Sequence, residues 1–245
     1  REGKDPNDII KHFHASLSAN AKKIYYYKVD GSLRNGVEIV THPFTLPYLY
    51  AHEEEVFAPI WNYLPKHGLK GDADNCGLHI HFSVLDEDNE TPGKPSPMVQ
   101  YKILKFVLGN RGNCEDIAKR PGNNYCAYED PRTRIAGRLL PRDRNRERLY
   151  CSRYCAINTN NSHTLEFRIF QSGLGKTTIF RAIEFVHSVY YFCLHSKVSE
   201  LTWAHYTHWL RFHTKTYLIL CKRMKIEPIK SKAAATIHKE EVKRE

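Results

Sequence analysis

Two short stretches decide the expected fold: residues 76–82, Cys-Gly-Leu-His-Ile-His-Phe, and residues 164–170, Thr-Leu-Glu-Phe-Arg-Ile-Phe. In both stretches apolar side chains alternate with polar or charged ones, which is the period of a β-strand with one buried face. The alternation places both histidines of the first stretch on one face, and the glutamate and arginine of the second stretch on one face. We therefore expect two strands, each with a polar and an apolar side.

The polar side of the first predicted strand carries His79 and His81. Two neighbouring imidazoles can ligate a divalent metal or bind a phosphate group. The structural alternative is a pair of hydrogen-bonded histidines on a half-exposed strand, and the spacing alone does not separate the two interpretations.

Carboxylates on two other predicted strands extend the pattern. Glu166 and Arg168 share a face, which by itself favours a structural ion pair but also suits a metal-binding carboxylate beside an anion-binding guanidinium. Glu38 lies between β-branched neighbours in a third predicted strand. Together Glu38, His79 and Glu166 form a mixed oxygen and nitrogen set that suits Mg²⁺ or Mn²⁺ better than tetrahedral zinc.

The rest of the chain alternates helical and extended patterns. Apolar spacing predicts helices over residues 8–23, 49–64, 98–109, 178–194 and 203–224. Further strands are predicted over residues 23–29, 36–41 and 154–158, whereas residues 111–148 are polar and give no assignment. This order predicts an α+β fold, with helices flanking an antiparallel or mixed sheet.

Composition limits the classes of function. The 245 residues include 37 Lys and Arg against 27 Asp and Glu, a net charge of +10, which predicts an anionic partner. A hydrophobic share of 41% excludes global disorder. No apolar run approaches the roughly 18–20 residues of a membrane span, and no signal peptide is evident, so we expect a cytoplasmic protein without a membrane partner. We expect a single domain over residues 1–229 and a polar tail over residues 230–245.

Three motifs occur in an order that resembles the amidoligase family, which belongs with glutamine synthetase and glutamate–cysteine ligase among the carboxylate–amine ligases. They are residues 30–43 (Asp-Gly-Ser-Leu, two residues, then Gly-Val-Glu-Ile-Val-Thr-His-Pro), residues 76–83 and residues 153–170. The resemblance covers residues 28–191. It implies a sheet of the glutamine synthetase type whose face binds ATP and Mg²⁺ or Mn²⁺. It also implies amide formation between a carboxylate (glutamate-like or peptide) and an amine through an acyl phosphate.

The resemblance also implies roles for individual residues. Glu38 and Glu166 would bind the metal, and His79 would lie at the metal and the nucleotide phosphates with His81 beside it. Arg168 would bind the phosphoryl group or the substrate carboxylate.

Three further residues match the family less closely. Arg153 is a second candidate for the anion, and Asp30 and Ser32 match a turn at the nucleotide site. The family's upstream Gly-x-Glu-x-Glu strand is missing before Asp30, and we expect it to precede Arg1 in the full protein.

Other functions remain open. A run of arginines interleaved with tyrosines could bind nucleic acid, in which case the protein would be an inactive ligase fold that binds nucleic acid or serves a structural role. These arginines are Arg132, Arg134, Arg138, Arg142, Arg144, Arg146, Arg148 and Arg153. A third interpretation is a metal-dependent hydrolase built on His79, His81 and Glu166.

Two motifs are weaker. Zinc binding by four cysteines stays open, although closely spaced pairs are absent and reduced thiols are expected. The four are Cys114, Cys126, Cys151 and Cys155. Residues 172–178 resemble a phosphate-binding loop, but Phe170 stands where that loop requires its first glycine, so we interpret them as a strand-to-helix turn.

Overall fold

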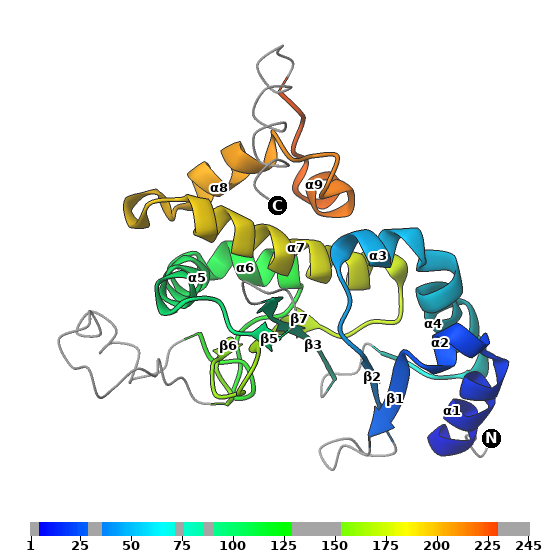
Figure 1. Ribbon diagram of the computed structural model, residues 1–245. Helices are drawn as coiled ribbons and strands as arrows, with labels where there is room; N and C mark the ends of the chain where they lie inside the picture. Colours follow the sequence, from blue (N-terminus) through cyan, green and yellow to red (C-terminus); the bar gives the residue numbers. More distant parts are fainter. Residues whose placement is uncertain (1–4, 29–35, 72–75, 86–90, 129–152, 230–245) are drawn as a thin grey trace. The chain divides into compact units, whose positions relative to one another are not determined.

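A computed structural model describes residues 5–28, 36–71, 76–85, 91–128 and 153–229 (Figure 1). The chain divides into two compact units. The first unit consists of Arg1–Leu78 and Gln171–Phe180, and the second of His79–Phe170 and Arg181–Glu245. The domain expected over residues 1–229 includes parts of both units.

The first unit begins with two short helices in place of the single helix predicted over residues 8–23. Helix α1 (Pro6–Ser16) starts where the Asp5 side chain accepts a hydrogen bond from the backbone N–H of Asn7, a typical N-cap. Ser18 caps α2 (Ala19–Lys22) in the same way. Because a residue in cap conformation cannot continue a helix, the helix is interrupted between α1 and α2.

Strands β1 (Tyr25–Lys28) and β2 (Glu38–Thr41) follow as an antiparallel pair. Lys28 lies opposite Glu38 in the register. The two strands form a two-stranded sheet of their own, so they do not join the sheet that contains residues 77–82. The first unit therefore has a separate small sheet.

The helix predicted over residues 49–64 consists of several pieces. They are α3 (Leu46–Ala51), the π-helical turn η1 (Glu53–Phe57), α4 (Ala58–Tyr63) and the 3₁₀ turn η2 (Pro65–His67). Gly68, with φ of +89°, ends the last turn in the left-handed region that glycine adopts without strain.

The main sheet has the order β3-β7-β6. Its strands are β3 (Gly77–Phe82), β7 (Leu165–Gln171) and β6 (Ile157–Asn158). Strands β6 and β7 are antiparallel, with Asn158 opposite Glu166. A further antiparallel pair consists of β4 (Val84–Leu85) and β5 (Pro92–Gly93). The strand predicted over residues 154–158 is shorter than expected, because β6 consists of Ile157 and Asn158 alone.

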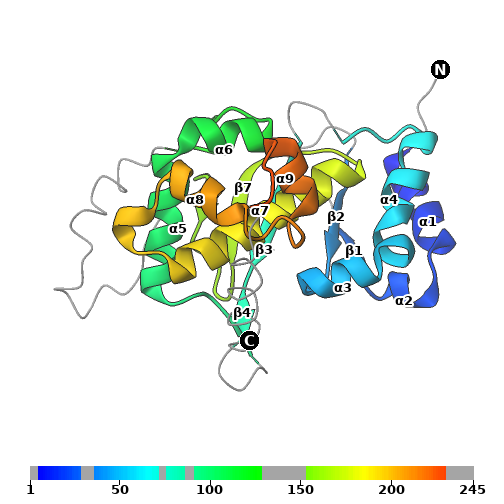
Figure 2. The same cartoon turned by 90° about the horizontal axis from the view of Figure 1, so that it is seen from above.

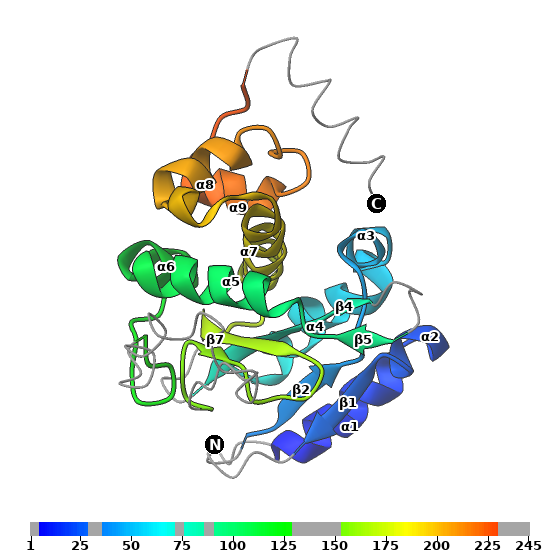
Figure 3. The same ribbon diagram turned by 60° about the vertical axis from the view of Figure 1, so that its left-hand side comes forward.

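Helices form two layers over this sheet in the second unit (Figures 1 and 3). They are α5 (Pro97–Gly109), α6 (Arg111–Ala118), α7 (Lys176–His195, which begins in the first unit), α8 (Trp203–Leu210) and α9 (Leu218–Met224), with a 3₁₀ turn η4 (Val198–Glu200). Figures 1 and 3 show α5, α6 and α7 between the sheet and the α8–α9 pair. Seen from above, α8 and α9 lie over α7 (Figure 2).

Aromatic side chains fill the spaces between these layers. The ring of Phe82 on β3 lies 4.7 Å from that of Tyr190 on α7, and Phe192 on α7 lies 5.3 Å from Tyr206 on α8. Phe106 of α5 contacts Phe192 at 5.4 Å. The apolar side of β3 therefore packs on α7, and its histidine side faces away from that helix.

The structure confirms the α+β class with antiparallel pairing, but distributes the described strands over three small sheets. Helix α6 lies in the segment that sequence left unassigned, where burial of Cys114, Ile117 and Ala118 stabilises it. The helix predicted over residues 203–224 is instead α8 and α9, separated by a turn. Within the described ranges, no helix is both long and apolar enough to span a membrane.

Candidate functional site

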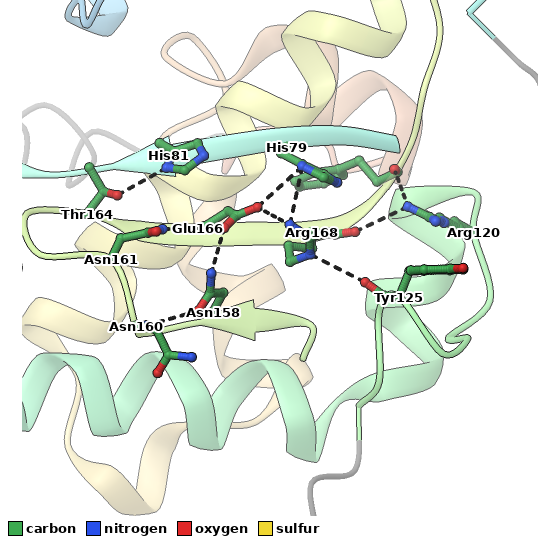
Figure 4. Close-up of polar contacts among 11 residues, drawn as sticks. His79, His81, Arg120, Tyr125, Asn158, Asn160, Asn161, Thr164, Glu166 and Arg168 are labelled. Carbon is green, nitrogen blue, oxygen red and sulfur yellow. Dashed lines mark hydrogen bonds and ion pairs between the residues drawn. The ribbon is translucent and has the colours of Figure 1, made fainter. Parts of the chain in front are cut away.

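The polar sides of β3 and β7 form one cluster (Figure 4). His81 Nδ1 lies 3.1 Å from the Thr164 hydroxyl, and His79 Nδ1 lies 3.3 Å from Glu166 Oε1. Because the β3 numbers rise as the β7 numbers fall, the two strands run in opposite directions. The alternation predicted from sequence thus brings His79, Glu166 and Arg168 together, with His81 alongside.

Glu166 is the centre of this cluster and is only 4% exposed. Its Oε2 accepts hydrogen bonds from Asn158 Nδ2 at 2.7 Å and from Asn161 Nδ2 at 3.3 Å. Its Oε1 forms an ion pair with Arg168 Nη1 and faces His79 Nδ1. Both carboxylate oxygens therefore have nitrogen donors, as a buried charge requires.

Arg168 connects the carboxylate to the neighbouring loop. Its Nε donates to the Tyr125 carbonyl at 3.4 Å, while Nη1 pairs with Glu166. Among the described residues, no hydrogen-bond acceptor is found for Nη2. Arg120 Nη1 donates to the carbonyls of Arg168 at 3.4 Å and Phe170 at 3.5 Å, which brings a second guanidinium to β7.

Protonation states follow from burial and these charges. Burial, together with the positive charges of Arg168 and Arg120, lowers the pKa of His79 to about 4, although Glu166 opposes the shift. Burial raises the pKa of Glu166, but the Asn158 hydrogen bond and the Arg168 charge outweigh it and leave this pKa below its usual value. At neutral pH the imidazole is therefore neutral and the carboxylate is ionised.

The neutral imidazole has one N–H and one lone pair. His79 Nδ1 lies 3.3 Å from Glu166 Oε1, which can only accept, and 3.5 Å from Arg168 Nη1, which can only donate. We assign the proton to Nδ1 because the contact with the carboxylate is the shorter of the two. Nε2 of His79 then carries the lone pair. With Arg168 and Arg120 against Glu166, the cluster has a formal charge of +1, so it can bind an anion.

Glu38, the third residue of the expected metal set, lies elsewhere in the fold. It is exposed on β2, opposite Lys28, in the two-stranded sheet of the first unit. His79 and Glu166 lie on the three-stranded sheet. The sequence pattern could not reveal this separation, because alternation specifies the face of a strand and not the sheet to which the strand belongs.

The other predicted site residues lie beside the cluster or outside the described chain. Arg153 is exposed, and its guanidinium lies 5.0 Å from the centre of the Tyr154 ring. Tyr154 in turn contacts Tyr125, which is 60% exposed, with the ring centres 5.9 Å apart. Asp30 and Ser32 lie outside the described residues, as do the arginines within residues 132–148.

Metal binding finds limited support in the side chains. Over the described ranges, no group of three or more His, Cys, Asp or Glu side chains is placed to hold a metal ion. Of the four candidate zinc ligands, Cys114, Cys126 and Cys155 are buried, and Cys151 lies outside the described residues. Burial raises the pKa of Cys126 to about 11, which keeps its thiol protonated, whereas zinc binds the thiolate.

The loop at residues 172–178 is a strand-to-helix turn between β7 and α7. Lys176, the residue that would contact phosphate in a phosphate-binding loop, forms an ion pair with Glu53 of η1. Its ammonium group also lies 5.6 Å from the centre of the Phe180 ring. This lysine is therefore engaged within the first unit.

Sequence reasoning missed several partners of the cluster. Asn158 and Asn161 hold Glu166, and Arg120 and Tyr125 reach β7 from the segment after α6. The one available signal was Asn158, a polar residue at the end of an apolar strand. The contacts from residues 120 and 125 depend on the tertiary fold.

A comparison of the chain with protein-family models, curated proteins and solved structures finds no match in any of the three.

Proposed function

We propose that the protein is an ATP-dependent carboxylate–amine ligase whose site is the face of β3 and β7, in a fold of the glutamine synthetase type. The observation that supports this function is the pair of the buried Glu166 with the half-buried Arg168, which lies on the same sheet face as His79 and His81. The substrates are a carboxylate, glutamate-like or within a peptide, and an amine. The reaction passes through an acyl phosphate.

Arg168 would bind the anionic group. Two contacts hold its guanidinium plane before an oxyanion binds: Nη1 pairs with Glu166, and Nε donates to the Tyr125 carbonyl. Nη2 is then left to bind the oxyanion. A held guanidinium stabilises the charge on a transferred phosphoryl group without reorganisation in the transition state. Arg120 adds the positive charge that Glu166 does not offset.

His79 would orient the amine. Glu166 fixes the imidazole through Nδ1, and the lone pair on Nε2 can accept a hydrogen bond from the amine N–H. The amine nitrogen then forms a bond to the acyl carbon as the bond to the phosphate oxygen breaks. The proton that the amine loses can pass to Nε2.

The described residues fit a divalent cation only in part. His79 and Glu166 offer one nitrogen and one carboxylate, and both oxygens of that carboxylate already accept hydrogen bonds. Mg²⁺ commonly binds through substrate phosphates with one or two carboxylates. We therefore propose that Mg²⁺ or Mn²⁺ enters with the ATP phosphates.

The test uses the purified chain with Mg²⁺-ATP, a panel of carboxylates and hydroxylamine as the amine. An acyl phosphate reacts with hydroxylamine to form a hydroxamate, so we expect ATP-dependent hydroxamate with equal amounts of ADP and phosphate. Arg168→Gln should lower kcat/KM by about 10²–10³-fold, the usual effect of removing a group that stabilises transition-state charge. Arg211→Gln, which changes an exposed arginine of the same unit, should leave the rate unchanged.

Two results would contradict the proposal: no hydroxamate with any carboxylate of the panel, or equal rates for wild type and Arg168→Gln. In the first case, tight binding of RNA or DNA that weakens steeply with salt would support the nucleic-acid alternative instead. The exposed Tyr125 and Tyr154 rings beside Arg153 offer the stacking surface which that alternative needs.

A further inference from the structure

A buried arginine lies away from the sheet. Arg181 on α7 is only 2% exposed, and its buried Nε has no hydrogen-bond partner among the residues that the structure describes. The guanidinium group is always charged in proteins, so it cannot respond to burial by losing its proton. A buried N–H group without an acceptor is costly, and native structures pair such groups.

The nearest charges increase the imbalance. The Nε of Arg223 on α9 is also buried without a hydrogen-bond partner in the described ranges. Its Nη2 donates to Asp116 of α6, at 2.8 Å to Oδ1 and 3.3 Å to the carbonyl oxygen. Burial and the repulsion from Arg223 lower the pKa of Arg181, while Asp116 acts in the opposite direction. The two cations therefore share the charge of Asp116, whose side chain is 68% exposed. The buried carboxylate of Glu184 on α7 accepts instead from the backbone N–H groups of Ile219 and Leu220 at the start of α9.

One bound anion would both accept from the two Nε–H groups and offset the positive charge. A buried water could accept a hydrogen bond, but it would leave the charge uncompensated. A tetrahedral oxyanion offers several acceptor oxygens and negative charge, and arginine pairs with phosphate more strongly than with neutral acceptors. We propose that the junction of α6, α7 and α9 binds a phosphate group, free or as a small ester, between Arg181 and Arg223.

The site meets solvent at one end and is independent of the sheet site. The Arg223 side chain is 32% exposed, so this end of the junction meets solvent. None of Arg181, Arg223 and Asp116 contributes to the cluster around Glu166. The phosphate site therefore does not depend on the proposed ligase function.

The experiment measures thermal unfolding and calorimetric binding of the full chain with inorganic phosphate, against chloride at matched ionic strength. Phosphate about tenfold above its dissociation constant should raise the wild-type midpoint by about 3–6 °C, because it binds only the folded state. Without phosphate, Arg181→Met should unfold at a higher temperature than wild type, since a buried unpaired charge is removed. Phosphate should leave the midpoint of that variant unchanged.

Arg223→Gln provides a second variant in case Arg181→Met does not fold. It changes a side chain that is partly exposed and should weaken phosphate binding at least about tenfold. Arg211→Gln is the matched control and should bind phosphate as wild type does. Methyl phosphate distinguishes a phosphate ester from free phosphate as the ligand. Binding equal to that of inorganic phosphate supports the ester, and no binding supports free phosphate. A wild-type midpoint that responds to phosphate no more than to chloride would overturn the proposal.

Discussion

Arg168 and Arg181 are arginines of the second unit, the first half-buried and the second buried, and their surroundings differ. Arg168 has a carboxylate, Glu166, within the same strand, and that carboxylate is held in turn by Asn158. Within the described part of the chain, the Nε of Arg181 has no partner, and the charges that act on Arg181 are those of Arg223 and the exposed Asp116. The comparison teaches that the chain neutralises Arg168 with a carboxylate of its own strand, whereas we propose an external anion for Arg181.

The largest expected effect comes from removing the carboxylate that neutralises Arg168. Glu166→Leu leaves the Arg168 charge without its partner and should lower the free energy of unfolding by about 3–5 kcal/mol. Urea unfolding followed by circular dichroism measures the loss. The double variant Glu166→Leu/Arg168→Met removes both charges and should recover most of the stability. A loss below about 1 kcal/mol in the single variant would show that the ion pair is not buried in solution.

A second prediction concerns a buried group that can lose its charge. His187 lies on α7, as Arg181 does, and faces the Tyr217 hydroxyl at 3.0 Å. Burial lowers the pKa of His187 to about 4. Between pH 6.5 and 4 the unfolded chain therefore binds the proton and the folded chain does not, so stability is complete above pH 6.5 and falls as the pH decreases.

This histidine should account for up to about 3 kcal/mol of the loss between pH 6.5 and 4. Urea unfolding across that range should show a shallower dependence for His187→Gln, whose amide can still bond Tyr217 but does not titrate. His195→Gln, at the exposed end of the same helix, should keep the wild-type slope. Equal slopes for His187→Gln and wild type would mean that His187 is protonated in the fold.

The smallest effect concerns the aspartate beside the two arginines. Asp116→Asn removes an exposed charge, so it should change the free energy of unfolding by less than about 1 kcal/mol. The same change removes a negative charge that competes with phosphate, and affinity at low salt should rise about two- to fivefold. Calorimetry measures this, with Asp8→Asn, an exposed aspartate paired with Lys11 in the first unit, as control. Weaker phosphate binding in Asp116→Asn would place the anion elsewhere.

Sequence reasoning predicted the sheet cluster well because the strand period is a local property. Side chains two apart share a face, so His79 and His81, and likewise Glu166 and Arg168, were expected together before any pairing was known. Helix lengths were predicted less well. Local caps and turns interrupt the N-terminal helix at Ser18, and apolar spacing does not register such interruptions.

Contacts between distant segments lay beyond sequence reasoning. The Tyr125 carbonyl reaches Arg168 across 43 positions, and no periodicity specifies such a contact. Glu38 was grouped with Glu166 because both are carboxylates on predicted strands and both match the amidoligase motifs, yet the two residues lie on different sheets. Which strands pair is a property of the whole fold and not of either strand.

By itself, the sequence determined which side chains share a strand face, that the chain combines helices with antiparallel strands, and that it carries excess positive charge. Those properties depend on spacing and composition. Only the tertiary structure decided that Glu166 neutralises Arg168, because Asn158 and Asn161 have to hold that carboxylate in place. It also decided that Arg181 is buried beside a second arginine, since charge becomes costly only where packing excludes water.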